Sequence, residues 1–443
     1  MINQYYMPRF CSTLLLVFTL QMAIGQTWTT TLDSVLTVLA DDELYHGQVL
    51  IAEQGQIVFH KAYGNLPDQQ TPITTTRSLA VKSVTKAFTA AAVLHLEQQG
   101  KLSLSDEVGT YFPDWPYRGI TIRQLLSMTS GLPSFIEKAV NEGDTTQWMR
   151  NADIVRFVSK YKVLVNPPGA AYNYQNSNFI VLAALVEQIS GVPFEDYVYR
   201  VVLQPLGLEH TFFQDLTTIT KGVDGDSFYA PSGDGNLYST AADLYRFEQA
   251  FYDNEILSEE NKQKTFTKTT LTDGTLSKYG LAWWVIDDGP EMEYYIIGDG
   301  PNIRASIQRY PERNSTLIYI HNFSGRYWKD VYWTVRNIWL GQDYTMPEKQ
   351  QELIEYDIDT KLYDQYVGSY LTPGFGLLHI TEEDGKLYLR PHPIPGKEEL
   401  VPSSDTTFYF RDQSVEWEFF LDEEGAVIGF GSRGNPESMG EKQ

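Results

Sequence analysis

Ser83 and Lys86, three positions apart, are the residues of this sequence best suited to covalent chemistry. They open an alanine-rich stretch, residues 83–99, whose pattern predicts an amphipathic helix that stops at Gly100. Residues three apart share a face of a helix, so the serine hydroxyl and the lysine amine can touch. A serine beside an amine is a candidate for an activated nucleophile.

The place of Ser83 at the predicted helix start has two interpretations. The exposed N–H groups and the positive end of the helix dipole would stabilise an oxyanion that forms nearby. Serine is also a good N-cap residue, and that role would be structural only. Residues 83–86 alone do not decide between a cap and a nucleophile.

A second polar group, Tyr174 and Asn176, precedes an apolar-periodic helix predicted over residues 177–190. On an extended loop, residues two apart point the same way, so a phenol and an amide would share one pocket. The alternative is ordinary turn chemistry, which such loop sequences often provide.

Metal and thiol chemistry have little support in the sequence. The only cysteine, Cys11, lies in a segment that we expect to be removed, and the seven histidines lack the spacing of a metal motif. The chain also has no G-x-S-x-G sequence, which disfavours an α/β-hydrolase. We therefore expect no metal and no other cofactor.

The elements around the candidate residues predict an α/β (α+β) fold. Five strands are expected, two before residue 83 and three much later: 47–52, 56–63, 294–297, 305–310 and 315–321. The simplest architecture is an antiparallel sheet built from both ends of the domain, with a helical insert between them. Helices predicted over 31–40 and 328–340 would cover a face of this sheet.

Two folded units are expected, because 443 residues exceed what one core usually holds. The first would span residues 26–342. Residues 343–359 are polar and acidic and predict a linker. Short alternating segments within residues 360–443 predict a small all-β barrel or sandwich.

Residues 1–25 have the pattern of a secretory signal peptide, with Arg9, an apolar run, and Ala23 and Gly25 before a cleavage site. We expect export to the periplasm or the medium, and a mature chain without an integral membrane segment. The formal net charge of −23 disfavours nucleic acid as a partner.

Together these features resemble the serine hydrolases related to class C β-lactamases and penicillin-binding proteins, which include esterases and D-amino-acid peptidases. The resemblance runs in order through SVTKAF at 83–88, IRQLL at 122–126, TSGLP at 129–133, YQN at 174–176, PLGL at 205–208, LYSTAADL at 237–244 and YGLAWW at 279–284. From residue 362 onward the chain resembles the lipocalin-like domain often joined to this family.

The resemblance implies a covalent acyl-enzyme on a small ester or peptide-like substrate. Ser83 would attack the carbonyl, Lys86 would assist its deprotonation, and Tyr174 would transfer protons. The substrate-binding residues would be Asn176, Gly298 and Gly300. Lys86 can act as a base only when neutral, which burial or a nearby positive charge favours.

The third motif departs from the family pattern. A lysine or histidine should occur near residues 294–300, but this stretch reads YYIIGDG. Arg304 is a candidate substitute, with a surface role as the alternative, whereas Asp299 has the wrong charge. The missing cation predicts weak activity on penicillins and D-Ala-D-Ala peptides relative to uncharged short-chain esters. It also leaves a second hypothesis, a catalytically silent scaffold or binding protein.

Overall fold

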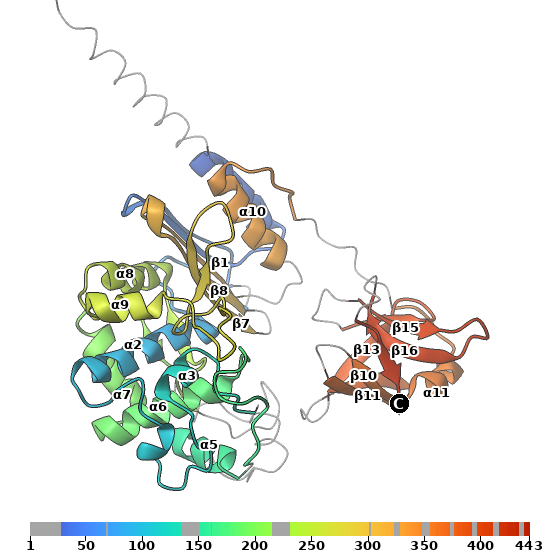
Figure 1. Ribbon diagram of the computed structural model, residues 1–443. Helices are drawn as coiled ribbons and strands as arrows, with labels where there is room; N and C mark the ends of the chain where they lie inside the picture. Colours follow the sequence, from blue (N-terminus) through green and yellow to red (C-terminus); the bar gives the residue numbers. More distant parts are fainter. Residues whose placement is uncertain are drawn as a thin grey trace, which may run out of the picture.

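The computed structural model describes residues 28–67, 70–133, 150–160, 162–214, 231–300, 303–322, 328–347, 355–372, 376–391, 397–410, 416–433 and 438–443. The expected signal peptide, residues 1–25, lies outside this part of the chain. We call the described residues up to 347 the first body and those from 355 onward the barrel body (Figure 1).

A six-stranded antiparallel sheet lies at the centre of the first body, in the order β2-β1-β9-β8-β7-β6. Its strands are β1 (Gly47–Glu53), β2 (Gln56–Tyr63), β6 (Trp284–Ile286), β7 (Glu293–Gly300), β8 (Ile303–Tyr310) and β9 (Ser315–Asn322). The predicted sheet, built from both ends of the domain, is confirmed. The prediction missed β6, because its three residues are too short to show an alternating pattern.

The sheet buries a separate core on each face, since successive side chains of a strand point to opposite sides. Leu50 and Ala52 of β1 belong to the core shared with the helical insert. Val49 and Ile51 belong to the other core, which includes the helix over residues 28–41 and α10 (Trp328–Leu340). The two predicted covering helices are therefore present.

The chain between β2 and β6 forms the predicted helical insert. Its α-helices are α2 (Thr85–Gln98), α3 (Ile122–Leu126), α5 (Asn151–Val158), α6 (Asn176–Ser190), α7 (Phe194–Val198), α8 (Ala241–Tyr252) and α9 (Glu259–Thr265). A short sheet, β3-β5-β4, joins Leu79–Ala80, Leu237–Ser239 and Phe212–Phe213.

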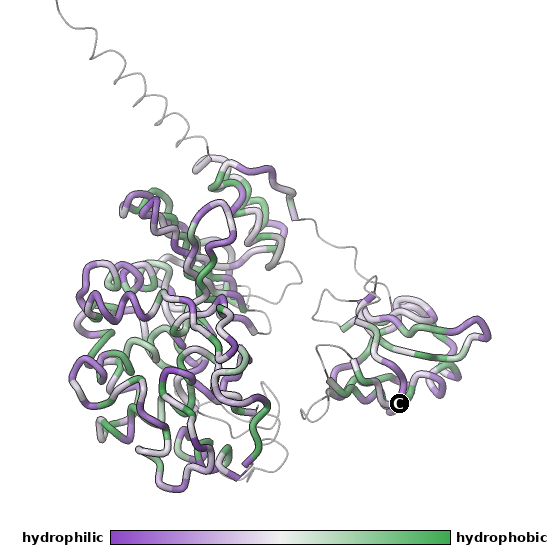
Figure 2. Tube along the Cα trace, in the orientation of Figure 1, coloured by the Kyte–Doolittle hydropathy of each residue, from purple (hydrophilic) through white to green (hydrophobic). Residues whose placement is uncertain are grey.

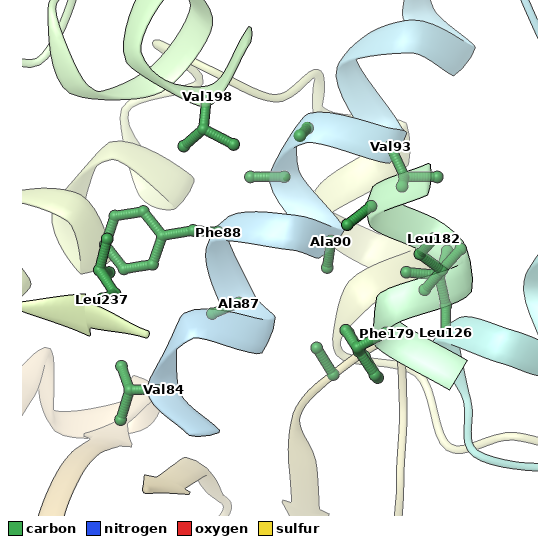
Figure 3. Close-up of a cluster of buried hydrophobic side chains, with 14 of the residues drawn as sticks. Val84, Ala87, Phe88, Ala90, Val93, Leu126, Phe179, Leu182, Val198 and Leu237 are labelled. Carbon is green, nitrogen blue, oxygen red and sulfur yellow. The ribbon is translucent and has the colours of Figure 1, made fainter. Parts of the chain in front are cut away.

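Helix α2 is the centre of this insert. Eleven of its 14 residues are buried, and Figure 3 shows Ala87 and Phe88 among side chains from α3, α6, α7 and β5. The prediction of an amphipathic helix is wrong here, because a helix surrounded on all sides has no solvent face. The alanines allow neighbouring helices to approach α2 closely.

The barrel body is an antiparallel eight-stranded barrel, closed in sequence order from β10 to β17. Its strands are β10 (Gly368–Thr372), β11 (Gly376–Glu383), β12 (Lys386–Pro391), β13 (Glu398–Pro402), β14 (Thr407–Tyr409), β15 (Glu416–Leu421), β16 (Val427–Ser432) and β17 (Gly440–Lys442). Aromatic and aliphatic side chains fill the core, and the tip between β15 and β16 is hydrophilic (Figure 2). The predicted all-β unit is confirmed.

In the part of the chain that the structure describes, no single helix has the length and hydropathy needed to cross a membrane. Helix α6 and the segment Phe194–Leu203 reach these values only as a pair, with a bend of 76° between them.

Candidate active site

Ser83 and Lys86 lie in contact, as their spacing predicts. Lys86 Nζ is 2.8 Å from Ser83 Oγ, and the lysine side chain is buried, with 1% of its surface exposed. Ser83 is part of a 3-10 turn, Lys82–Val84, that leads directly into α2. Residues 83–86 thus join a turn to a helix, whereas the prediction had them open the α-helix itself.

The N-cap interpretation of Ser83 is wrong. Val84 occupies the N-cap position of α2 and Val81 that of the 3-10 turn, and neither element has a side-chain cap hydrogen bond. The hydroxyl of Ser83 faces the amine of Lys86. This geometry excludes the cap and is compatible with the nucleophile interpretation.

A segment before β5 positions the first turns of α2. Lys86 Nζ donates a hydrogen bond to the carbonyl oxygen of Asp234 at 2.8 Å. One turn along the helix, Thr89 Oγ1 donates to the carbonyl oxygen of Gly233 at 2.7 Å. Lys86 is therefore held between a backbone carbonyl and the Ser83 hydroxyl, and these two hydrogen bonds fix the position of its amine.

Asp234 also carries a carboxyl group close to the two lysines of this region. Burial raises the pKa of the Asp234 carboxyl, while the charges of Lys86 and Lys82 act to lower it. Asp234 could not be identified from the sequence, because its approach to α2 depends on the tertiary fold.

Tyr174 lies beside Lys86, as expected. Lys86 Nζ is 5.2 Å from the centroid of the Tyr174 ring and 5.8 Å from that of Phe179. Tyr174 is 40% exposed. The adjacent Asn173 N–H donates to the carbonyl oxygen of Met128 at 2.8 Å, which ties this loop to the residues after α3.

The structure corrects the predicted setting of Asn176. This residue is the first of α6, with Gln175 as the extended N-cap, and so it does not lie on an extended loop. Asn176 Oδ1 is buried and has no hydrogen-bond partner among the described residues. Asn176 shares a helix face with Phe179, whose ring lies near Lys86.

Strand β7 approaches Ser83 through its glycines. A Cβ atom added at Gly298 would lie 1.9 Å from the carbonyl oxygen of Val81 and 2.9 Å from the Ser83 nitrogen. A Cβ added at Gly300 would lie 3.1 Å from Lys82 Cε. The two glycines are therefore beside Ser83 and Lys82, and no lysine or histidine fits at position 298 on this backbone.

Arg304 is not a substitute for the missing cation. It pairs with Asp299, its neighbour across β7 and β8, at 2.8 Å between Nη1 and Oδ2. Strand alternation directs Asp299 away from the face that carries Gly298 and Gly300, so this ion pair lies on the side of the sheet opposite Ser83. The Arg304 side chain is only 11% exposed, and the surface interpretation is therefore wrong as well.

Tyr172, two residues before Tyr174, belongs to an aromatic cluster of which the sequence indicated only Trp284, in YGLAWW at 279–284. The Tyr172 ring lies 5.3 Å from the rings of Tyr279 and Trp284, and Trp284 stacks on Tyr295 at 5.9 Å. Burial raises the pKa of the Tyr172 phenol, and Tyr174 adds to that rise. The cluster draws on three separate segments, so no sequence spacing could indicate it.

Comparison with known proteins agrees with this architecture. Residues 38–337 match the family model described as Beta-lactamase. The chain belongs to the β-lactamase family. It is a serine hydrolase of the β-lactamase-like class, as its motifs predicted. Residues 355–443 match a domain of unknown function, DUF3471.

This β-lactamase family member is similar over most of its length to Penicillin-binding protein 4* of Bacillus subtilis (strain 168). The two are 30% identical over 429 residues, which cover 89% of this chain and 94% of that protein. The octameric penicillin-binding protein homologue from Pyrococcus abyssi shares the fold, with a TM-score of 0.60 and 21% identity over 93% of this chain and 99% of that one. D-amino acid amidase from Ochrobactrum anthropi SV3 does so with a TM-score of 0.56 and 22% identity, over 70% and 98%.

Proposed function

We propose that this β-lactamase family member is an exported enzyme that cleaves a small ester or amide through an acyl-enzyme on Ser83. The observation that carries the proposal is the 2.8 Å contact between Ser83 Oγ and the buried Lys86 amine. A buried lysine is costly unless it is paired, and no carboxylate of the described residues lies within salt-bridge distance of this one. A catalytic role explains why the protein keeps the Lys86 amine at this buried position. Export is supported by the sequence of residues 1–25 alone.

In the first half of the proposed reaction, Ser83 Oγ attacks the substrate carbonyl carbon and its proton moves to the Lys86 amine. The bond to the leaving alcohol or amine then breaks, and Tyr174 delivers a proton to the leaving group. In the second half, water attacks the acyl ester on Ser83 and the acid departs. The serine hydroxyl is restored with a proton from the attacking water, and the proton that Lys86 took from Ser83 passes to the Tyr174 phenolate, which returns both groups to their starting states.

The proposed substrate is a short-chain ester or a D-amino-acid amide. The aromatic cluster of Tyr172, Trp284 and Tyr295 offers flat apolar surface next to Tyr174, suitable for an apolar acyl group. The D-amino acid amidase that shares the fold motivates the choice of a D-configured substrate.

A steady-state assay with 4-nitrophenyl butyrate and the two enantiomers of phenylalanine amide tests this proposal. We expect turnover of the ester and of the D-amide in preference to the L-amide. Ser83→Ala should lower each rate by about 10³-fold or more. The matched control Ser105→Ala removes an exposed hydroxyl in the loop after α2 and should leave the rates unchanged. Absence of turnover by the wild type would favour the silent scaffold instead.

A further inference from the structure

Lys82, the residue before the nucleophile, has an unusual backbone conformation. Its φ angle is 46°, in the left-handed region that favours glycine. A lysine there costs conformational energy that a glycine would avoid. Backbone strain of this kind clusters at functional sites, so the side chain of Lys82 is a candidate for a functional role.

The side chain of Lys82 runs along β7 on the face turned toward Ser83. A Cβ atom added at Gly300 would lie 3.1 Å from Lys82 Cε and 3.5 Å from Lys82 Cγ and Cδ. Gly298 and Gly300 are two apart on the strand and share this face. The lysine stem therefore fills the space that a side chain projecting from β7 would otherwise occupy.

The charge of Lys82 is not committed to another side chain. Among the described residues its ammonium group has no hydrogen bond and no ion pair. Its stem reaches Gly300, on the face of β7 that also carries Gly298, and Gly298 packs against Val81 and the Ser83 nitrogen. Arg304 differs in both respects, because it is paired with Asp299 and lies on the opposite face of the sheet.

We propose that Lys82 supplies the positive charge that β7 lacks and binds a carboxylate of the substrate beside Ser83. This inference rests on the proposed hydrolase function and specifies the preferred substrate. An acyl donor with a carboxylate near the scissile bond is preferred over the matched neutral molecule. It reverses the expectation, drawn from residues 294–300, that such substrates react weakly. Lys82 is then a specificity-determining residue carried by the turn before the nucleophile.

A matched pair of substrates tests the inference. N-acetyl-D-alanyl-D-lactate and its C-terminal amide share the scissile ester and differ in one negative charge. We expect the wild type to prefer the carboxylate by about tenfold in kcat/KM, the value of one charged hydrogen bond. Lys82→Met should remove this preference, chiefly through KM, and Lys82→Arg should retain most of it. Lys101→Met, which removes an exposed lysine after α2, should leave both rates unchanged.

Ionic strength gives an independent readout of the same charge. Raising the salt from about 20 to about 500 mM shortens the Debye length and should reduce the preference of the wild type. The rates of Lys82→Met should show no such selective change. A preference for the carboxylate that persists in Lys82→Met overturns the inference.

Two further results would overturn the inference without touching the hydrolase proposal. One is a wild-type preference close to one, with normal turnover of the neutral ester. The other is an equal loss on both substrates in Lys82→Met, which would mean that the lysine acts on the Ser83 and Lys86 pair or on the fold.

Binding to the inactive Ser83→Ala protein, measured by calorimetry, decides the question without turnover. We expect tighter binding of the carboxylate than of the amide, and no difference once Lys82→Met is added. Equal binding of the two molecules to Ser83→Ala overturns the inference. Hydrolysis of neither substrate by the wild type would contradict the proposed function, so the two failures are distinguishable.

Discussion

The interior around α2 and the interior of the barrel are both closed and well packed, but they bury different chemistry. Around α2 the described core contains Lys86 together with the hydroxyl groups of Thr85 and Thr89. The buried residues of the polar and charged types described in the barrel body are Thr372, Thr407 and Ser438, none of which carries a charge. Because a buried amine is costly, its presence supports the proposal that the active site lies here. The described barrel interior contains no comparable group.

Lys86→Met should give the largest effect. Methionine keeps most of the side-chain volume and removes the base, so the kcat of ester hydrolysis should fall by about 10³-fold, or about 4 kcal/mol. Thermal stability should stay level or rise, because an apolar side chain suits this buried site. A kcat within tenfold of the wild-type value would mean that the buried amine of Lys86 is not needed for hydrolysis. The interior around α2 would then have no functional distinction from the barrel interior.

Phe419→Ala probes the barrel side of the comparison. Phe419 is 1% exposed and stacks on Tyr366 at 4.1 Å, so its truncation should lower the free energy of unfolding by about 3 kcal/mol. Hydrolysis of the ester at 25 °C should be unaffected. Calorimetry and the esterase assay check both points. Phe251→Ala in the core of the first body is the matched truncation, and it should destabilise the body that carries Ser83.

Tyr174→Phe sharpens the account of the α2 region. The ring beside Lys86 is kept and only the phenol oxygen is lost, so proton delivery to the leaving group should suffer and kcat should fall by about 10²-fold. The loss should be larger for an amide than for a 4-nitrophenyl ester, whose leaving group departs without a proton. An equal loss on both substrates would assign Tyr174 to another step.

Thr89→Val should give the smallest effect. It removes the hydrogen bond to the carbonyl oxygen of Gly233 and should cost about 1 kcal/mol in the free energy of unfolding. The esterase kcat should fall only a few-fold, since Lys86 keeps its own bond to Asp234. Urea unfolding measures the first quantity. A fall in kcat as large as that of Lys86→Met would mean that the hydrogen bond from Thr89 to the Gly233 carbonyl is needed for catalysis as well as for stability.

Local geometry made part of the site predictable from sequence. Ser83 and Lys86 are three residues apart, and any helical turn brings them together. The setting of Asn176 could not be predicted so well, because the start of α6 depends on a boundary that sequence patterns fix only loosely. The fold class was predictable because alternation and apolar periodicity are strong in the long strands and helices, but not in β6 with its three residues.

Other features of the site depend on how distant segments meet. The positive φ of Lys82, and its path along Gly300, follow from the packing of β7 against the turn before α2. Arg304 lies on the face of the sheet opposite Ser83 because of the register in which β8 pairs with β7. A register shifted by one residue would move its side chain to the other face, and sequence patterns do not exclude such a shift. Tertiary contacts of this kind decide which charged side chains lie beside Ser83. Whether another residue replaces the cation missing from residues 294–300 could therefore be judged only from the structure.

Covalent labelling of Ser83 tests the central claim most directly. The wild type, Ser83→Ala and Lys86→Met would each be incubated with a fluorophosphonate probe, followed by intact-mass analysis and peptide mapping. We expect a single adduct on the wild type, located at Ser83, that forms much more slowly in Lys86→Met and is absent from Ser83→Ala. Failure of the wild type to form an adduct, or an adduct that persists in Ser83→Ala, would contradict the account.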